Sequence, residues 1–247
     1  MAVEFSFNVY GLTRQYERVK IANAGIASDA NPVGGTIFYI NDTADGEYQF
    51  FDAKGNTIES VEIGDKPYAY KIVTPGTRDK YYVYHDKIYN NFVWTYYKGG
   101  AYVYETAESM GVTDTTYNNV GSGKTNTEKV MTRDNGAYIT ADSNGFPTIW
   151  YQLQQVRNAK VGGCDDWFVP SMNEAEELRL AIKSGGITGG VIAGSSHNPS
   201  IFNNIPLWSS SVSVKDKENA SYWFPFGSKW LDSEKNSRNS VFFTRAF

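Results

Sequence analysis

The segment Gly121 to Thr125 reads GSGKT and contains the residue types that bind phosphate in nucleotide-binding loops. Such a loop also needs a glycine five residues before Gly123 and an apolar strand that leads into it. Asn118 stands at that glycine position, and the residues before the segment are polar. We therefore interpret GSGKT as a tight, hydrogen-bonded loop and not as a nucleotide site.

Residues that could hold a metal ion or act as a nucleophile are sparse. The chain has two histidines, His85 and His197, which are far apart in sequence, and one cysteine, Cys164. A catalytic thiol needs a neighbouring base, and a zinc site needs clustered ligands. One cysteine allows no disulfide within the chain. We expect Cys164 to be a small buried hydrophobic residue.

Acidic residues leave two kinds of chemistry open. The neighbours Asp165 and Asp166 could bind calcium through loop oxygens, although such acids more often hydrogen-bond to backbone N–H groups. Glycosidases use paired carboxyl groups, and sequence alone does not pair any of the 27 Asp and Glu residues. We expect no cofactor, with calcium as the alternative.

The C-terminal stretch from Trp208 to Phe247 interleaves aromatic residues with many Ser and Asn residues. An ordinary pair of antiparallel strands shows this alternation. The same composition is typical of adaptable binding surfaces, where Tyr and Trp supply contact area and Ser and Asn supply hydrogen bonds. Both interpretations remain open from composition alone.

Amino-acid composition indicates which classes of protein this chain can belong to. Hydrophobic residues make up 41% of the 247 residues and charged residues 20%, so the chain can bury a core. The net charge of −4 and the scattered basic residues argue against nucleic-acid binding. No apolar run approaches the ~20 residues of a membrane span. The first residues lack the basic and apolar regions of a signal peptide.

Strands are expected in the first half of the chain and at its end. Residues 34–105 alternate aromatic and β-branched residues with polar ones, which predicts antiparallel strands. Residues 47–63 predict a hairpin with its turn at residues 54–56. Residues 106–147 predict loops with one or two helical turns over 128–135. A long surface loop is expected over 185–206, with strands after it.

Two helices are predicted between these strand regions. Residues 148–160 place Ile149, Leu153 and Val156 on one face. In residues 170–186, Ser171 and Glu174 have the spacing of a capping box, and an apolar stripe follows at Ala175, Leu178 and Ile182. The mixture of strands and helices predicts an α+β domain over residues 34–247. Residues 1–33 are expected to form an N-terminal leader or assembly segment.

Several motifs resemble those of C-type-lectin-like domains in phage and bacterial surface proteins. The segment GGCDDWFVPSMNEAEELRLAI (162–182) is similar to that family's signature, in which Asp-Trp and a Pro-Ser or Pro-Thr pair precede a helix. GGTIFYI (34–40) resembles the opening strand. The ending is similar at LWSSS (207–211), ASYWFPFGSKW (220–230) and VFFTRAF (241–247). The resemblance implies a C-type-lectin-like fold of antiparallel sheets with two helices and long loops.

Some proteins with this ending are variable proteins of diversity-generating retroelements, in which mutagenesis rewrites codons of the last strands. The resemblance therefore implies a hypervariable ligand-binding face. Phe242 departs from the family, which usually has Arg there, and Thr244 replaces an apolar residue. The scaffold would include Trp208, Phe224, Phe226, Trp230, Val241 and Ala246. The variable positions would be Ser213, Asp216, Ser221, Tyr222, Pro225, Ser228, Leu231, Asp232, Ser233, Ser237, Arg238, Ser240 and Phe242.

Together these observations predict a non-enzymatic receptor-binding or adhesin-like protein on a phage tail or a cell surface, recognising a protein or glycan receptor. We expect neither nucleic-acid binding nor membrane insertion. Tyr222, Leu231, Arg238 and Phe242 are the expected binding hot spots. One alternative is a carbohydrate-active or oxidase-type enzyme on a related fold, marked by carboxyl groups with shifted pKa values in one pocket. Another is a structural virion module in which residues 1–33 mediate homo-oligomer assembly.

Overall fold

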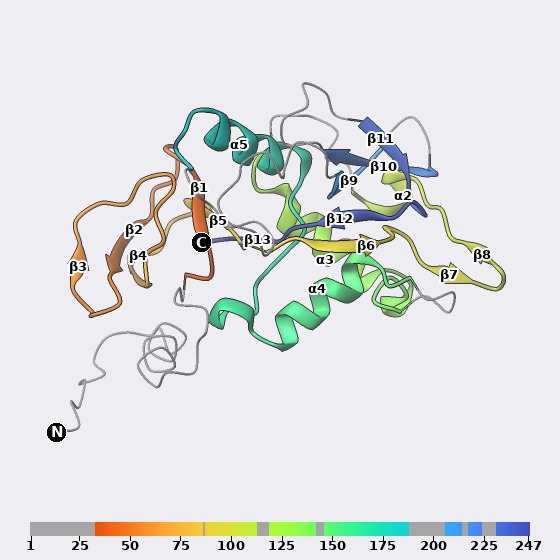
Figure 1. Cartoon of the computed structure of the whole chain (residues 1–247), viewed down its shortest axis with the longest axis horizontal. Helices are drawn as coiled ribbons and strands as arrows, with labels where there is room; N and C mark the ends of the chain where they lie inside the picture. The colour runs from red at the N-terminus through yellow and green to blue at the C-terminus, as the bar shows by residue number, and fades with distance from the viewer. Residues whose placement is uncertain are drawn as a thin grey trace.

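Antiparallel strands dominate the part of the chain that the computed structural model describes. That part comprises residues 33–85, 87–112, 119–141, 146–187, 206–213, 217–223 and 231–247, with only the backbone described for residues 221–223 and 231. Helices fill the middle of the sequence and strands its two ends (Figure 1). The described structure is therefore of the α+β class that the sequence predicts.

The first and last described strands lie in one small sheet. Strand β5 (Tyr81–Tyr84) is its centre, with β1 (Thr36–Ile40) on one side and β13 (Thr244–Ala246) on the other. Both neighbours run antiparallel to β5. The beginning and the end of the described chain are thus joined through the same strand.

A larger sheet gathers most of the C-terminal strands. Its order is β11 (Leu231–Glu234), β10 (Asn219–Trp223), β9 (Leu207–Val212), β12 (Asn239–Val241) and β6 (Tyr89–Phe92). The contact between β12 and β9 is parallel, and the other three are antiparallel. This sheet occupies the end of the molecule opposite β2 and β4 (Figure 1).

The remaining described strands form two smaller sheets. Strand β2 (Glu47–Phe51) pairs with β3 (Thr57–Ile58) and with β4 (Ala69–Thr74). The predicted hairpin over residues 47–63 is therefore confirmed, and Gly55 in its turn has a φ of 85°, which favours glycine. Strands β7 (Tyr97–Lys98) and β8 (Ala101–Tyr102) form a short hairpin.

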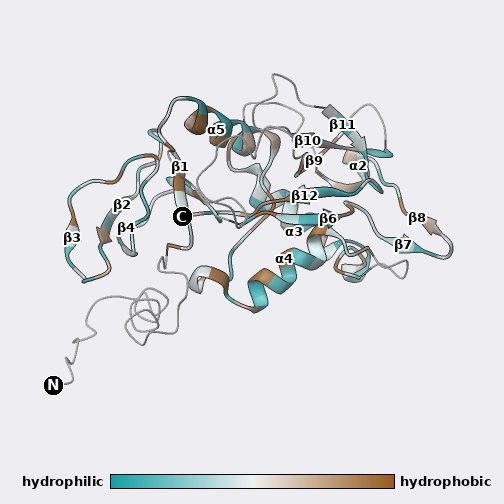
Figure 2. Ribbon diagram, in the orientation of Figure 1, coloured by the Kyte–Doolittle hydropathy of each residue, from teal (hydrophilic) through white to brown (hydrophobic). Residues whose placement is uncertain are grey.

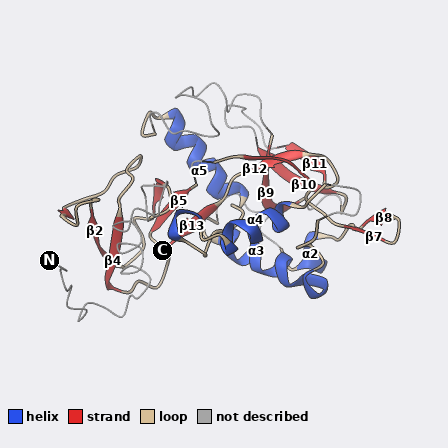
Figure 3. Cartoon of the chain, turned by 60° about the horizontal axis from the view of Figure 1, so that its bottom comes forward, coloured by secondary structure: helices blue, strands red, loops and turns tan. Residues whose placement is uncertain are grey.

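The described residues between the strand regions form four α-helices: α2 (Ala107–Met110), α3 (Ser122–Thr132), α4 (Ile149–Asn158) and α5 (Met172–Lys183). Short 3-10 turns at Arg133–Gly136 and Val161–Gly163 follow α3 and α4. Helices α3 and α4 lie together (Figure 3), and the start of α3 contacts the first turn of α5. The ribbons of α4 and α5 both carry hydrophilic and hydrophobic segments (Figure 2).

The two predicted helices are confirmed. Ile149, Leu153 and Val156 of α4 are all buried. In α5 the predicted capping box is present, because Ser171 and Glu174 exchange hydrogen bonds between side chain and backbone. These local signals identified each helix without any knowledge of the tertiary structure.

The interpretation of GSGKT as a loop is wrong. Helix α3 begins at Ser122, inside that segment, and Gly121 caps it in a left-handed conformation with a φ of 110°. The cap provides no side-chain hydrogen bond. The Glu174 carboxylate does so instead, because its Oε1 atom accepts from the N–H groups of Gly121 at 2.9 Å and Gly123 at 3.2 Å. A buried carboxylate therefore occupies the N-terminus of α3, where backbone donors favour an anion.

Three hydrophobic clusters form the core. The largest packs α3 and α4 against the five-stranded sheet and contains Trp94, Trp150 and Trp167. The second lies beneath α5, with Leu178 and Phe168 among its members. The third lies between the sheets of β5 and β2 and includes Val33, Phe50 and Phe247.

Candidate ligand-binding face at the C-terminal strands

Strand β9 supports the face on which the predicted binding residues lie. All six of its residues are buried. The indole Nε1 of Trp208 donates to the carbonyl of Phe92 at 3.0 Å, and the indole of Trp94 donates to the carbonyl of Ser209 at 2.9 Å. Tryptophan donors from two places thus fix β9 in the core.

Strands β10 and β11 extend the sheet outward from β9. In this ladder Ser221 pairs with Asp232, Tyr222 with Leu231, and Ala220 with Ser233. The Ser213 hydroxyl donates to Asp232 Oδ2 at 2.9 Å. The ladder therefore brings residues from three separate segments of the predicted set together.

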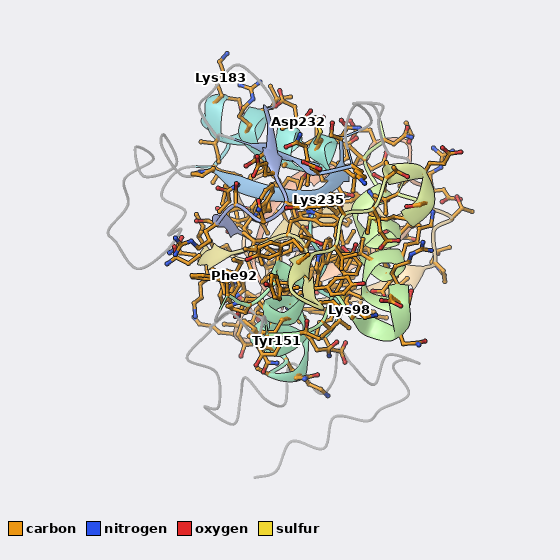
Figure 4. All side chains as sticks on the ribbon, turned by 90° about the vertical axis from the view of Figure 1, so that its right-hand side faces the viewer. Phe92, Lys98, Tyr151, Lys183, Asp232 and Lys235 are labelled. Atoms are coloured by element: carbon orange, nitrogen blue, oxygen red, sulfur yellow. The ribbon has the colours of Figure 1, made fainter. Side chains whose placement is uncertain are left out.

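Lys235 holds the turn after β11 against the core. Its side chain is fully buried. Nζ donates to the carbonyls of Glu105 at 2.6 Å and Lys217 at 2.8 Å and lies 5.0 Å from the centre of the Trp94 ring. The Lys235 carbonyl accepts from the N–H of Trp94 at 2.7 Å. Figure 4 shows this end of the molecule, with Asp232 on the outer strand and Lys235 nearer the centre.

Charged side chains lie on the outer part of this face. Asp232, Glu234 and Arg238 are exposed, and the Arg238 guanidinium lies 4.4 Å from the centre of the Phe146 ring. Burial raises the pKa of the Tyr104 phenol, and the nearby carboxylate of Glu234 raises it further. An exposed polar surface with both charge signs thus lies on a backbone that is tied to the core.

Phe242, one of the predicted binding residues, is buried in the core. Its side chain is 1% exposed and packs in the cluster beneath α5, while the next residue, Phe243, packs in the largest cluster. Consecutive side chains of an extended segment point to opposite sides, and both sides are covered here. Phe242 is a core residue, so its assignment as a hot spot is wrong.

Two predicted serines are also placed inside the protein. Ser213 and Ser240 are each 6% exposed. The Ser213 hydroxyl bonds to Asp232, and the Ser240 hydroxyl donates to Asn90 Oδ1 at 2.7 Å. The prediction that these two side chains are available to a ligand is wrong, because both hydroxyls are already used within the fold.

The remaining predicted positions divide into three groups. Asp232 and Arg238 are exposed, and Ser233 and Ser237 are half-buried. Only the backbone is described for Ser221, Tyr222 and Leu231. Positions outside the described residues are Asp216, Pro225 and Ser228, together with the scaffold candidates Phe224, Phe226 and Trp230.

The scaffold assignments that the structure describes are confirmed. Trp208 is 1% exposed, Val241 is fully buried and Ala246 is 4% exposed. Cys164 is fully buried, as predicted. Lys235 was missed, because a lone lysine in a polar stretch gives no local sign that it is buried.

One of the two calcium candidates, Asp166, forms an ion pair with Arg245. Both carboxylate oxygens of Asp166 accept from the Arg245 guanidinium, at 2.9 and 2.8 Å. Among the described residues no three His, Cys, Asp or Glu side chains gather as a metal site would require. No helix in the described ranges is long and apolar enough to cross a membrane.

Comparison with known proteins identifies no relative. No family model matches the chain, and a search of curated proteins finds no significant match.

Proposed function

We propose that this chain is a non-enzymatic, receptor-binding protein with a C-type-lectin-like fold that presents strands β10 and β11 to a ligand. The observation that carries this proposal is the contrast between a fixed backbone and exposed side chains at one end of the molecule. The backbone is held by β9 and by buried Lys235, whereas Asp232, Glu234 and Arg238 are exposed. A preorganised surface of this kind loses little conformational entropy on binding.

Contacts among the signature segments support the lectin-like part of the proposal. Phe168 and Thr244 exchange backbone hydrogen bonds of 2.7 and 2.9 Å. The N–H of Ser210 donates to the Pro170 carbonyl at 2.8 Å, so the WSSS segment contacts the segment before α5. The stretches that carry the resemblance therefore bond to one another, which is expected if they determine the fold.

We further propose that the exposed part of this face is diversified by a retroelement. Of the candidate variable positions, Asp232 and Arg238 are exposed, and Ser233 and Ser237 are half-buried. The proposal also keeps the candidates whose side chains lie outside the described residues, which are Asp216, Ser221, Tyr222, Pro225, Ser228 and Leu231. The receptor would be a protein or glycan on a cell surface, and the chain itself would belong to a phage tail or a cell surface.

Sequencing the encoding locus in many isolates tests the diversification. We expect substitutions to concentrate at exposed positions such as Asp232 and Arg238, with a reverse transcriptase gene nearby. Buried positions such as Trp208 and Phe242 serve as the internal control and should stay constant. Equal variation at buried and exposed positions, or none at either, would contradict the proposal.

Cell binding tests recognition independently of variation. Fluorescently labelled chain is applied to a panel of bacterial cells, and the double variant Asp232→Ala/Arg238→Ala should bind at least about tenfold more weakly to any strain that the wild type labels. The matched control is Lys54→Ala/Glu59→Ala, which also removes one exposed base and one exposed acid but far from this face. Equal binding by both double variants would exclude the proposed face.

A further inference from the structure

A cleft of about 900 Å³ has a lining that includes no residue of strands β10 and β11. Its walls come from β1 and β2, from the loop before β5, from residues 119–121 at the start of α3, and from α5. Strands β1 and β5 lie next to the small sheet of β2, β3 and β4 (Figure 1). The volume is within the usual range of small-molecule sites, roughly 300–1,000 Å³.

Tyrosine rings form the apolar part of the cleft. Tyr39 and Tyr82 pack edge to face with ring centres 5.5 Å apart. Tyr48 packs against Tyr81, with ring centres 5.1 Å apart, and is also close to Phe247. Tyr39 and Tyr48 are half-buried, so each ring is supported by the core and still reaches the cleft.

Amide and carboxylate groups lie beside these rings in fixed positions. Asn41 Oδ1 accepts from the backbone and the hydroxyl of Thr43 at 3.1 and 2.8 Å, and Asn41 Nδ2 donates to the Asp79 carbonyl at 3.3 Å. The Asp79 carboxylate is 3.9 Å from Lys124 Nζ. Asn119 adds a second amide to the lining. The cleft thus combines hydrogen-bonding groups with aromatic surface.

The charges of the lining select against anionic ligands. Arg78 is the basic residue of the lining, and Asp79 and Glu177 are the acidic ones. Burial raises the pKa of Glu177, and neighbouring Glu176 raises it further. A phosphorylated ligand would meet no excess of positive charge, since recognition of phosphate usually uses several basic groups. A neutral ligand rich in hydroxyl groups suits this lining better.

We propose that this cleft is a saccharide-binding site in which a sugar ring stacks on a tyrosine face and its hydroxyl groups bond to the amides and carboxylates. Tyr and Trp rings offer rigid apolar area with a polar edge, and hydroxyl groups both donate and accept hydrogen bonds. The site is separate from the β10–β11 face, and it does not depend on the function proposed for that face.

A glycan array of neutral oligosaccharides tests the proposal, with sialylated and sulfated forms of the same backbones included. We expect the full-length chain to bind neutral members. Tyr39→Ala and Asp79→Asn should each weaken that binding at least about tenfold, whereas Tyr39→Phe should retain it because the ring remains. Competition with the free oligosaccharide distinguishes recognition of the sugar itself from recognition of its presentation on a surface.

Two controls make the result decisive. Thermal unfolding shows that each variant is folded, and Asp232→Ala/Arg238→Ala should bind the array as the wild type does. Absence of binding by the folded wild-type chain across the array overturns the proposal. Binding that survives Tyr39→Ala and Asp79→Asn but is lost in Asp232→Ala/Arg238→Ala also overturns it, because the sugar would then occupy the C-terminal face.

Discussion

Phe242 and Phe243 are consecutive residues whose side chains enter different parts of the core. Alternation along a strand is commonly taken to mean that one side is exposed. In this segment a helix-covered cluster lies on one side and the largest cluster on the other, so neither phenylalanine reaches solvent. The position of a residue in an alternating pattern therefore specifies its direction but not its exposure.

Replacement of Phe242 should affect folding and not ligand contact. We expect Phe242→Ala to lower the free energy of unfolding by about 3–5 kcal/mol, because the change leaves a cavity in a packed cluster. Phe242→Leu, which keeps most of the apolar volume, should lose less. Chemical denaturation measures both variants. A loss below about 0.5 kcal/mol for the alanine variant would be typical of a surface site and would contradict the buried assignment.

At the level of elements, Glu174 links two helix N-termini. Its Oε2 atom accepts from the Ser171 N–H at 2.8 Å within the capping box of α5, while Oε1 accepts from the two glycine N–H groups at the start of α3. Gly123 is needed for this approach, because a Cβ there would lie 2.1 Å from the Glu174 carboxylate. One side chain therefore aligns α3 with α5.

Removal of this carboxylate should destabilise both helix starts. We expect Glu174→Ala to cost about 2–4 kcal/mol, through the lost cap and the buried N–H groups left without an acceptor. Hydrogen exchange should show faster exchange at the Gly121 and Gly123 amides. Glu176→Ala on the same helix is the control and should change stability by about 1 kcal/mol or less, because its ion pair with Arg179 lies within one helix and is partly exposed to solvent. Unchanged protection at both glycines would contradict the link.

Local elements were predictable where their signals lie close together in sequence. The capping box at Ser171 and Glu174 spans four residues, and the turn at Gly55 lies within its own hairpin, so both could be recognised. The start of α3 could not, because its acceptor lies 53 residues beyond Gly121. Lys235 and Arg245 were missed for the same reason. A charged residue is normally expected at the surface, and its burial depends on partners that only the folded chain supplies.

The candidate face was predictable only in part. The register of β10 and β11 unites Ser221 and Asp232 as the resemblance implies, but burial removes Ser213, Ser240 and Phe242 from the set. Sequence assigns a residue to a strand more reliably than to one of its sides, because the other layers of the fold decide which side is covered. The C-type-lectin-like fold itself stays a prediction.

For the whole molecule, Arg245 joins distant parts of the chain. Its guanidinium is 1% exposed and bonds to Asp166, to the Val33 carbonyl at 3.1 Å and to the Tyr70 hydroxyl at 3.3 Å. It also lies 4.8 Å from the centre of the Phe247 ring. Segments from the beginning, the middle and the end of the described chain thus converge on one cation.

Loss of this cation should weaken the whole assembly. We expect Arg245→Met to lower the free energy of unfolding by about 3–5 kcal/mol, because Asp166 and two further acceptors lose their donor. Arg179→Met removes a guanidinium–carboxylate pair within α5 that is partly exposed to solvent, and it should cost less than about 1 kcal/mol. Denaturant titrations of the two variants give the comparison. Similar losses of unfolding free energy in both variants would show that Arg245 does not hold the distant segments together.

The position of β13 beside β5 also bears on how the chain folds as it is synthesised. The Phe247 carbonyl accepts from the N–H groups of Lys80 at 2.8 Å and Tyr81 at 2.9 Å, so β5 pairs with residues that are synthesised much later than itself. Contacts between such distant segments slow folding and leave strand edges exposed in the meantime. Until residues 244–247 have been synthesised, the edge of β5 that pairs with β13 lacks its native partner.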